Sequence, residues 1–238
     1  IALQISGGSS ISGLVGYWDF SDSNNLGKNK VDDTSLDLHG IDTSTSIVKL
    51  SNPVGESATA IALDGSSSYL SGLVSFLPVR NSAYTIGAWV YMTKDSSNGI
   101  IGWGNYTYGG QVNALRSDCD ATGFVNYSWG PDIQYCQATK FTNKWVQIIA
   151  TYDGNGTSSG THGLRTLYVD GNNVETQTIN RLFVSNNDLD PENLQWKFNL
   201  TIGKTYGSEY FQGQMTNVMV FNRALTTSEI SSLYNGNY

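Results

Sequence analysis

The sequence predicts an all-β domain built from many short strands, and two observations favour this class. The chain of 238 residues contains 26 glycines, 14 tyrosines and 6 tryptophans, but only 13 lysines and arginines together. Short alternating apolar and polar runs stand between clusters of Gly, Asn, Asp and Ser, which is typical of strands joined by turns. Because a sandwich of this length is routinely one domain with a sizeable core, we expect a single all-β domain.

The last strand and the helix after it are the clearest elements. Residues 213–221 are apolar at nearly every position near their end, which predicts a strand buried on both faces. Residues 200–202 predict the strand before it. Thr227 is the expected cap of a short helix, in which Ile230 and Leu233 form one apolar stripe. On the last strand, one face is expected to carry Met215, Asn217, Met219 and Phe221.

This ending resembles the closing signature of the laminin-G-like jelly rolls, a branch of the concanavalin A-like lectin/glucanase superfamily. The shared features are a glycine turn, a buried strand and the run Asn222-Arg-Ala-Leu225 before the capped helix. Five further landmarks stand upstream in the family's order, at residues 14–20, 60–70, 84–91, 144–152 and 167–171.

The resemblance covers roughly residues 14–236 and implies a two-sheet antiparallel jelly-roll sandwich with a short C-terminal helix. We therefore divide the chain into an N-terminal strand with a flexible linker, residues 1–13, and a laminin-G-like domain, residues 14–238.

The charge balance and hydropathy exclude two classes of partner. A net charge of −7 and a pI near 4.6 argue against nucleic acid and anionic lipid, because a phosphate-rich surface requires a basic patch. The chain contains no run of 18 apolar residues, so we expect no membrane insertion.

The cysteines and glycosylation motifs indicate an oxidising, extracellular setting. Cys119 and Cys136 are the only cysteines and flank an interval of 16 residues. A disulfide between them would contribute about 3 kcal/mol in the chain-entropy model, and the alternative is two buried free thiols. We expect a secreted or cell-surface glycoprotein. The four candidate N-glycosylation sites are Asn105, Asn126, Asn155 and Asn199.

The sequence offers no catalytic constellation. Hydrolysis of a glycosidic bond usually needs two carboxylates, about 5 Å apart for retention or roughly 6.5 to 9.5 Å apart for inversion. On a strand this requires acids at alternate positions, as in the Glu-x-Asp-x-Glu pattern of the superfamily's glucanases, and none of the five glutamates stands in that pattern. We therefore predict a domain that is not an enzyme.

The resemblance also implies a calcium site, because laminin-G-like domains often hold Ca²⁺, which takes six to eight oxygen ligands. The acidic segment of residues 32–37 resembles the family's Asp-x-Ser segment, although a turn-forming role for these aspartates is an equal alternative. Asn217 stands where relatives commonly carry an acid. The candidate ligands of one structural Ca²⁺ are Asp33, Asp37, Asp64 and Asn217.

A region rich in aromatic residues is the candidate carbohydrate site. Residues 103–110 and 124–135 place aromatic rings beside amides and carboxylates, and a sugar packs its C–H surface on rings while polar groups bind its hydroxyls. The candidate glycan-binding residues are Trp103, Tyr106, Tyr127 and Trp129, of which Trp103 and Tyr106 have a core position as their alternative.

The segment before residue 14 has the alternation of a half-buried strand, with Ile1, Leu3 and Ile5 as its apolar positions. Such a strand either pairs within its own domain or adds to the sheet edge of a neighbouring subunit, which would build a homopolymer. Two functions follow as alternatives. One is an adhesive domain that recognises carbohydrate or an extracellular glycoprotein, and the other is a structural subunit of a glycosylated extracellular fibril.

Overall fold

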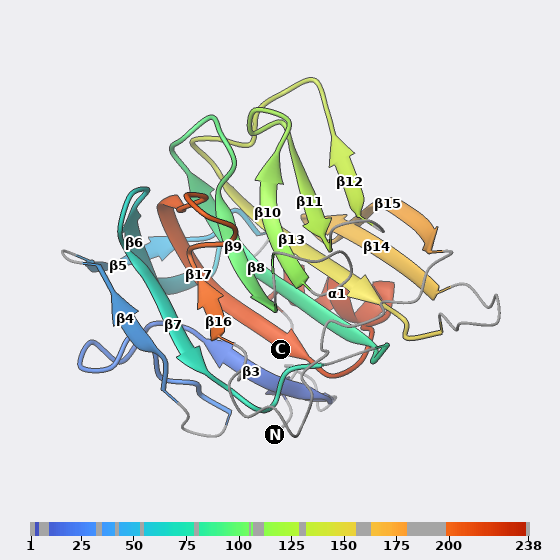
Figure 1. The fold of residues 1–238 in the computed structure, drawn as a ribbon, viewed down its shortest axis with the longest axis horizontal. Coiled ribbons are helices and arrows are strands. Elements are labelled where there is room, and N and C mark those ends of the chain that lie inside the picture. The colour runs from blue at the N-terminus through green and yellow to red at the C-terminus, as the bar shows by residue number, and fades with distance from the viewer. Residues whose placement is uncertain are drawn as a thin grey trace.

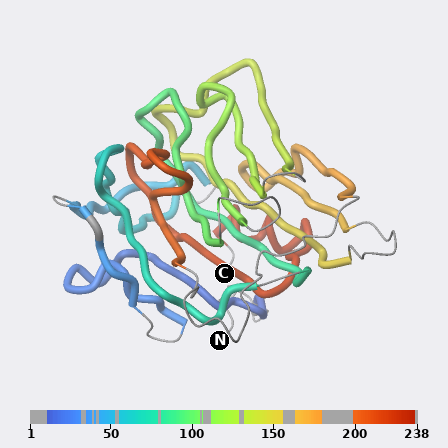
Figure 2. Tube along the Cα trace, viewed as in Figure 1, coloured from blue at the N-terminus to red at the C-terminus, as the bar shows by residue number. Residues whose placement is uncertain are grey.

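A computed structural model of the chain describes residues 3–4, 10–31, 35–40, 43–52, 55–78, 81–104, 106, 112–128, 132–155, 163–179 and 199–236. Two antiparallel sheets lie face to face, and one short helix follows the last strand (Figure 1; Figure 2). The predicted class, an all-β sandwich with a short C-terminal helix, is confirmed.

The described part of the front sheet has seven strands. Their order is β12 (Ile133–Cys136), β11 (Gly123–Tyr127), β10 (Val112–Asp118), β9 (Gly99–Gly104), β16 (Asn199–Ile202), β7 (Tyr69–Leu73) and β4 (Asp37–His39). Every pairing between these strands is antiparallel.

The second sheet lies behind the first and has eight strands in the described residues. Their order is β15 (Asn172–Ile179), β14 (Gly163–Val169), β13 (Trp145–Tyr152), β8 (Tyr84–Met92), β17 (Gln212–Phe221), β6 (Ser57–Asp64) and β5 (Thr45–Lys49), with β3 (Leu14–Trp18) pairing the end of β17. Because β17 pairs β6, β8 and β3, it lies at the centre of this sheet.

Two apolar cores hold the layers together. The larger core lies between the sheets and includes Trp103, Leu115 and Ile148. The smaller core lies on the opposite face of the eight-stranded sheet, where α1 (Thr227–Tyr234) packs Ile230 and Leu233 onto the strands. The apolar stripe predicted for the helix is therefore what fixes it to the sheet.

The expected alternation along β17 is interrupted by a bulge. Asn217 adopts a positive φ of 47°, and the pairing with β8 shifts register between Thr216 and Met219. As a result Val218 points into the core between the sheets, whereas Met219 points toward α1. The prediction that Met215 and Met219 share a face is wrong, because the extra residue of the bulge reverses the later side chains.

The helix cap lies one residue before the predicted position. Thr226, not Thr227, accepts the backbone N–H of Glu229, and the Glu229 carboxylate in turn accepts from the Thr226 backbone N–H. This reciprocal capping box satisfies two N–H groups that the first helical turn leaves without an intrahelical acceptor. Arg223 donates two further hydrogen bonds to the same carboxylate.

The Glu229 carboxyl makes the stability of the domain sensitive to acid. Hydrogen bonds from Arg223 lower its pKa to about 2, against about 4.3 in an unfolded chain. This stabilisation is complete above the unfolded pKa and is lost as the pH falls from about 4 to 2. We expect Glu229→Gln to cost about 1 kcal/mol at pH 7, after solvent screening, and almost nothing at pH 2. Urea unfolding at both pH values measures this, and a difference independent of pH would contradict the assignment.

The N-terminal segment pairs within its own chain where it is described. β1 (Leu3–Gln4) pairs β2 (Ser10–Ile11), with Leu3 opposite Ile11. Ile11 is buried in the smaller core, and the carbonyl of Gly13 accepts the N–H of Asn222. Residues 11–13 therefore belong to the sandwich, and this pairing does not favour donation to a neighbour. Ile1 and Ile5 lie outside the described residues, and assembly into a fibril stays a prediction.

Across the residues that the structure describes, no helix is long and apolar enough to cross a membrane.

Candidate functional site

The outer face of the seven-stranded sheet carries a row of directly paired residues across β11, β10, β9 and β16. The row consists of Tyr127, Ala114, Gly102 and Thr201. Because side chains alternate along a strand, the neighbours of this row, such as Leu115, point into the core between the sheets. The row therefore faces away from the core.

Aromatic and charged residues gather over this row. We name Tyr106, Arg116, Tyr127, Tyr206 and Glu209 the outer-face cluster. The hydroxyl of Tyr106 lies where a Cβ of Gly102 would be, so the absence of a side chain at Gly102 admits the phenol. The Tyr106 and Tyr206 rings lie 5.7 Å apart, and Tyr206 is 50% exposed. A ligand on this face would meet the Tyr206 ring directly.

A partly buried ion pair forms the polar part of the cluster. Arg116 donates from Nη1 to Oε1 of Glu209, and the two side chains are each 19% exposed. The second carboxylate oxygen of Glu209 accepts a hydrogen bond of 2.6 Å from Thr205 Oγ1. The guanidinium carbon of Arg116 lies 5.2 Å from the centre of the Tyr127 ring, a cation–π distance. The pair and the ring therefore hold one another in place.

The turn between β16 and β17 positions Tyr206 and Glu209. The Glu209 carbonyl accepts the N–H groups of Gly99 and Thr205, each at 3.2 Å. A Cβ on Gly99 would collide with the Thr205 nitrogen and the Glu209 carbonyl oxygen, so only glycine lets the turn lie this close to β9. These backbone contacts therefore help to fix the turn against β9.

Two hydrogen-bond donors of the cluster are buried and have no partner among the described residues. They are Oη of Tyr106 and Nε of Arg116. Burial, together with the negative charge of Glu209, raises the pKa of Tyr106, so its hydroxyl keeps its proton at neutral pH. Burial and the nearby Asp132 raise the pKa of Tyr127 to about 12. An unsatisfied buried donor costs free energy, so both donors favour a ligand that supplies acceptors.

The predicted glycan-binding residues divide into three cases. Tyr106 and Tyr127 lie together on the outer face, and their binding role stays a prediction. Trp103 is fully buried in the core between the sheets, so its prediction as a binding residue is wrong and its alternative is right. Because side chains alternate between the two faces of a strand, Trp103 lies on the inner face of β9, where it pairs with Asn113. Trp129 lies outside the described residues.

Sequence reasoning missed Arg116, Tyr206 and Glu209. Arg116 and Glu209 stand 93 residues apart, and only the register of β9, β10 and β16 brings them together. The turn of residues 204–210, Lys-Thr-Tyr-Gly-Ser-Glu-Tyr, did carry a signal, because two tyrosines flank a glycine between two predicted strands.

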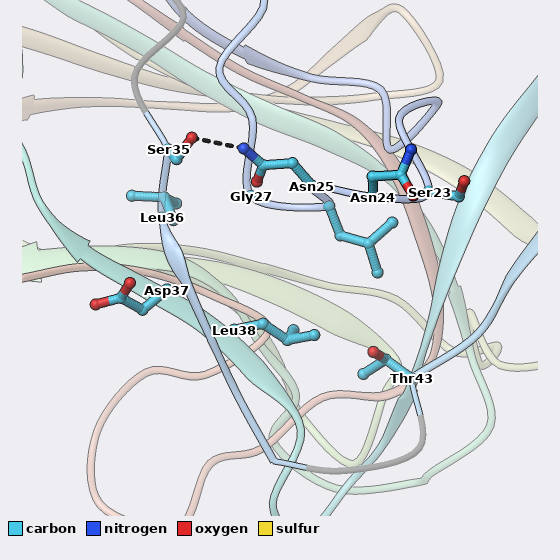
Figure 3. A pocket seen from close by; sticks show the side chains of 10 residues that line it. Ser23, Asn24, Asn25, Gly27, Ser35, Leu36, Asp37, Leu38 and Thr43 are labelled. Carbon is cyan, nitrogen blue, oxygen red and sulfur yellow. Dashed lines mark hydrogen bonds between the residues drawn. The ribbon is translucent and has the colours of Figure 1, made fainter.

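A hollow lies at the β4 edge of the same sheet and has a volume of about 470 Å³ (Figure 3). It is lined by Ser23, Asn24, Asn25, Leu26, Gly27, Ser35, Leu36, Asp37, Leu38 and Thr43. Asn25 Nδ2 donates to Ser35 Oγ across it at 2.7 Å. Its amides, hydroxyls and leucines suit a small polar molecule, and none of the described residues that line it is aromatic.

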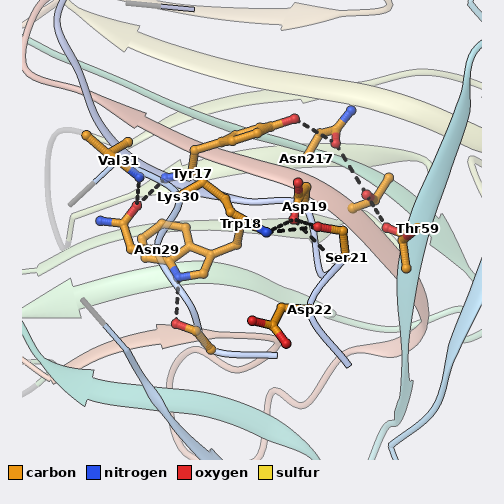
Figure 4. A network of polar contacts seen from close by, with 12 residues as sticks. Tyr17, Trp18, Asp19, Ser21, Asp22, Asn29, Lys30, Val31, Thr59 and Asn217 are labelled. Atoms are coloured by element: carbon orange, nitrogen blue, oxygen red, sulfur yellow. Dashed lines mark hydrogen bonds and ion pairs between the residues drawn. The ribbon is translucent and has the colours of Figure 1, made fainter. Parts of the chain in front are cut away.

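A polar network holds the loop that lines this hollow (Figure 4). Asn29 Oδ1 accepts the N–H groups of Tyr17 and Val31, and Trp18 Nε1 donates to the Gly27 carbonyl at 3.1 Å. The Leu36 N–H donates to the same carbonyl at 2.9 Å. β3 thus fixes both walls of the hollow.

The predicted calcium ligands do not come together. Asn217 stands five residues along β17 from Gln212, the partner of Asp64, so the two side chains are roughly 16 Å apart and cannot share an ion whose ligands lie within about 2.6 Å. Asp37 lines the hollow on the other sheet, and Asp33 lies outside the described residues. The predicted combination is therefore wrong, and calcium binding itself stays a prediction.

The Asp64 and Asn217 side chains have structural partners instead. Asp64 accepts the backbone N–H groups of Ser66, Ser67 and Ser68, which lower its pKa against the opposing effect of desolvation. The Asn217 carbonyl oxygen accepts from the Tyr17 hydroxyl at 3.0 Å (Figure 4). Within the described residues, no three His, Cys, Asp or Glu side chains converge on one point.

The predicted disulfide between Cys119 and Cys136 is confirmed. Of the candidate glycosylation sites, Asn155 and Asn199 are exposed, and Asn105 lies outside the described residues. Asn126 is fully buried, and its amide donates to Asn113 Oδ1 and to the Ala114 carbonyl. A glycan on Asn126 is incompatible with this packing, so that prediction is wrong for the folded domain.

Solved structures with similar folds include binding domains of two bacterial toxins. The binding domain of Paraclostridial Mosquitocidal Protein 1 has a TM-score of 0.64 and 16% identity, over 94% of this chain and 52% of that chain. The botulinum neurotoxin serotype G binding domain has a TM-score of 0.61 and 13% identity, over 93% of this chain and 50% of that one. This chain thus spans about half the length of these toxin domains.

Domain 4 of AbnA, a GH43 extracellular arabinanase from Geobacillus stearothermophilus solved with arabinotriose, matches over nearly its full length. Its TM-score is 0.54 and its identity 17%, over 93% of this chain and 98% of that chain. At such identities these likenesses show the fold. No curated protein sequence matches significantly. The family Laminin_G_3, described as the concanavalin A-like lectin/glucanases superfamily, matches residues 64–231, more than half of the sequence. The chain belongs to this family.

Proposed function

We propose that the chain is a non-catalytic, extracellular carbohydrate-binding domain whose ligand lies on the outer-face cluster. The observation that carries the proposal is the position of the exposed Tyr206 ring beside two unpartnered buried donors on one sheet face. Rings that stack on sugar C–H groups and donors that bind sugar oxygens are the two elements of a carbohydrate site.

The neighbours in fold support a binding role. Two of them were solved with a sugar ligand, AbnA domain 4 with arabinotriose and a botulinum DC binding domain with SialylT. Cell entry of botulinum neurotoxin type C depends on an interaction with two ganglioside molecules. The superfamily also contains glucanases, so catalysis must be judged on this chain's own residues.

The described glutamates are distributed over four different parts of the fold. Glu56 precedes β6, Glu175 lies on β15, Glu209 lies in the turn before β17, and Glu229 lies on α1. Glu209 and Glu229 are each engaged by an arginine. The disulfide supports an extracellular location, as does the extracellular arabinanase that contains one of the neighbours.

Substitution of the exposed ring tests the site. We expect Tyr206→Ala to weaken the binding of any oligosaccharide found on a glycan array by about tenfold, because the substitution removes the stacking surface. The Tm should change little, since the side chain is half exposed. Isothermal titration calorimetry measures the loss. Tyr91→Ala is the matched control, because Tyr91 is a half-buried tyrosine on β8 of the other sheet. Equal losses in both variants would contradict the placement.

A further inference from the structure

We infer that the outer-face cluster selects neutral sugars and rejects sugars that carry a carboxylate. The inference rests on the proposed function, because it names the ligand class of the same site. Its basis is the ion pair of Arg116 with Glu209 at the base of the cluster.

The charge of Arg116 is already compensated within the protein. Glu209 accepts from Arg116 through one carboxylate oxygen and from Thr205 through the other. Because both members of the pair are only 19% exposed, solvent and salt screen their attraction less than they would at the surface. A ligand carboxylate at this position would lose its hydration and meet a pair with no net charge, which is unfavourable.

The donors that remain suit neutral acceptors. Tyr106 Oη and Arg116 Nε each offer an N–H or O–H group without a partner in the described structure. The Tyr106 phenol remains protonated at neutral pH, because burial raises its pKa. An acceptor that satisfies either donor must enter this buried space, and a neutral oxygen enters it at less cost than a carboxylate.

The wider charge distribution acts in the same direction. Asp132 lies close enough to Tyr127 to raise the pKa of its phenol, and it accepts the Ser128 N–H beside the cluster. The chain as a whole has a net charge of −7. An anionic ligand therefore approaches against the long-range potential of a negatively charged chain.

The test compares neutral with acidic oligosaccharides on the full chain. The neutral probes are arabinotriose, xylotriose, cellotriose and galactotriose, and the acidic probes are trigalacturonic acid and 3′-sialyllactose. Calorimetry at low salt should give the wild-type protein at least about tenfold tighter binding to its best neutral probe than to either acidic probe. This comparison needs no variant, so it stands even if a substitution unfolds the domain.

The variant Glu209→Gln then separates charge from shape. It keeps the shape of the side chain but leaves the positive charge of Arg116 uncompensated, so the affinity for the acidic probes should rise at least about fivefold relative to the affinity for the best neutral probe. The matched control is the double variant Arg116→Gln/Glu209→Gln, which removes both charges and should reject the acidic probes again. Thermal unfolding verifies that each variant is folded.

The outcomes distinguish the two proposals. If no probe binds the wild-type protein, or if binding is insensitive to Tyr206→Ala, the proposed function fails and the inference fails with it. If a probe binds through Tyr206 but the wild-type protein prefers an acidic sugar, only the inference is overturned. An unchanged ratio of neutral to acidic affinity in folded Glu209→Gln overturns it as well.

Discussion

Replacement of Arg165 by alanine is expected to lower the free energy of unfolding by about 4 kcal/mol. Arg165 lies on β14 of the eight-stranded sheet, is fully buried and reaches across to the other sheet. Since a domain of this kind is stable by only about 5 to 15 kcal/mol, the loss would be a large part of the total.

The expected cost follows from the partners that Arg165 would leave behind. Its Nε and Nη2 donate to the Tyr84 hydroxyl at 3.0 and 2.6 Å, and its Nη1 donates to the Asn126 carbonyl and Ser128 Oγ. The Tyr84 hydroxyl donates onward to Asn126 Oδ1 at 2.7 Å. All four residues are buried, so alanine would leave several acceptors without donors and open a cavity between the sheets.

Urea unfolding of two control variants completes this test. Arg165→Lys keeps the charge but cannot bridge the same acceptors with a planar fork, so we expect an intermediate loss. Lys140→Ala removes a cation from an exposed pair with Asp95, which should cost under 1 kcal/mol. A loss below 1 kcal/mol in Arg165→Ala would show that the network does not stabilise the fold.

Reduction of the Cys119–Cys136 disulfide is expected to cost about 3 kcal/mol, because the bond closes a loop with a sequence separation of 17. The bond joins the turn after β10 to the end of β12. We also expect faster amide exchange in β11 and β12 and weaker ligand binding, since Tyr127 lies at the end of β11 and Arg116 on the adjoining β10.

The turn itself explains why the local effect should be large. Cys119, Asp120 and Ala121 have φ values of 54°, 52° and 62°, a left-handed run that costs non-glycine residues about 1 kcal/mol or more each. Ala121 is fully buried, and its carbonyl accepts the Phe141 N–H. When the disulfide is reduced, one of the contacts that stabilise this unfavourable backbone conformation is lost, and the turn should open more readily.

Chemical unfolding with and without a reductant measures the cost. The variant Cys119→Ala/Cys136→Ala is the control, because it should be as unstable as the reduced protein and insensitive to reductant. A midpoint that reductant leaves unchanged in the native protein would contradict this expectation.

The sequence by itself predicted the fold class and the position of the closing strand and helix, because these depend on local pattern and on the family resemblance that the pattern carries, and it offered the disulfide beside the alternative of two free thiols. Alternation over a few residues, the run at 222–225 and the apolar stripe of the helix are readable without knowing which strands pair. The same local reasoning misplaced the helix cap by one residue and the later side chains of β17, since one bulged residue reverses every position after it.

The site depended on register, which only the tertiary structure decided. Trp103 and Tyr106 stand three residues apart in the same aromatic segment, yet one is buried between the sheets and the other lies on the outer face. Arg116 meets Glu209 because β9 pairs with both β10 and β16. Asp64 and Asn217 stay apart because Asp64 pairs with Gln212, which lies five residues before Asn217 on β17. The physical reason is that ladder hydrogen bonds between strands distant in sequence, and not neighbouring residues, set which side chains share a face.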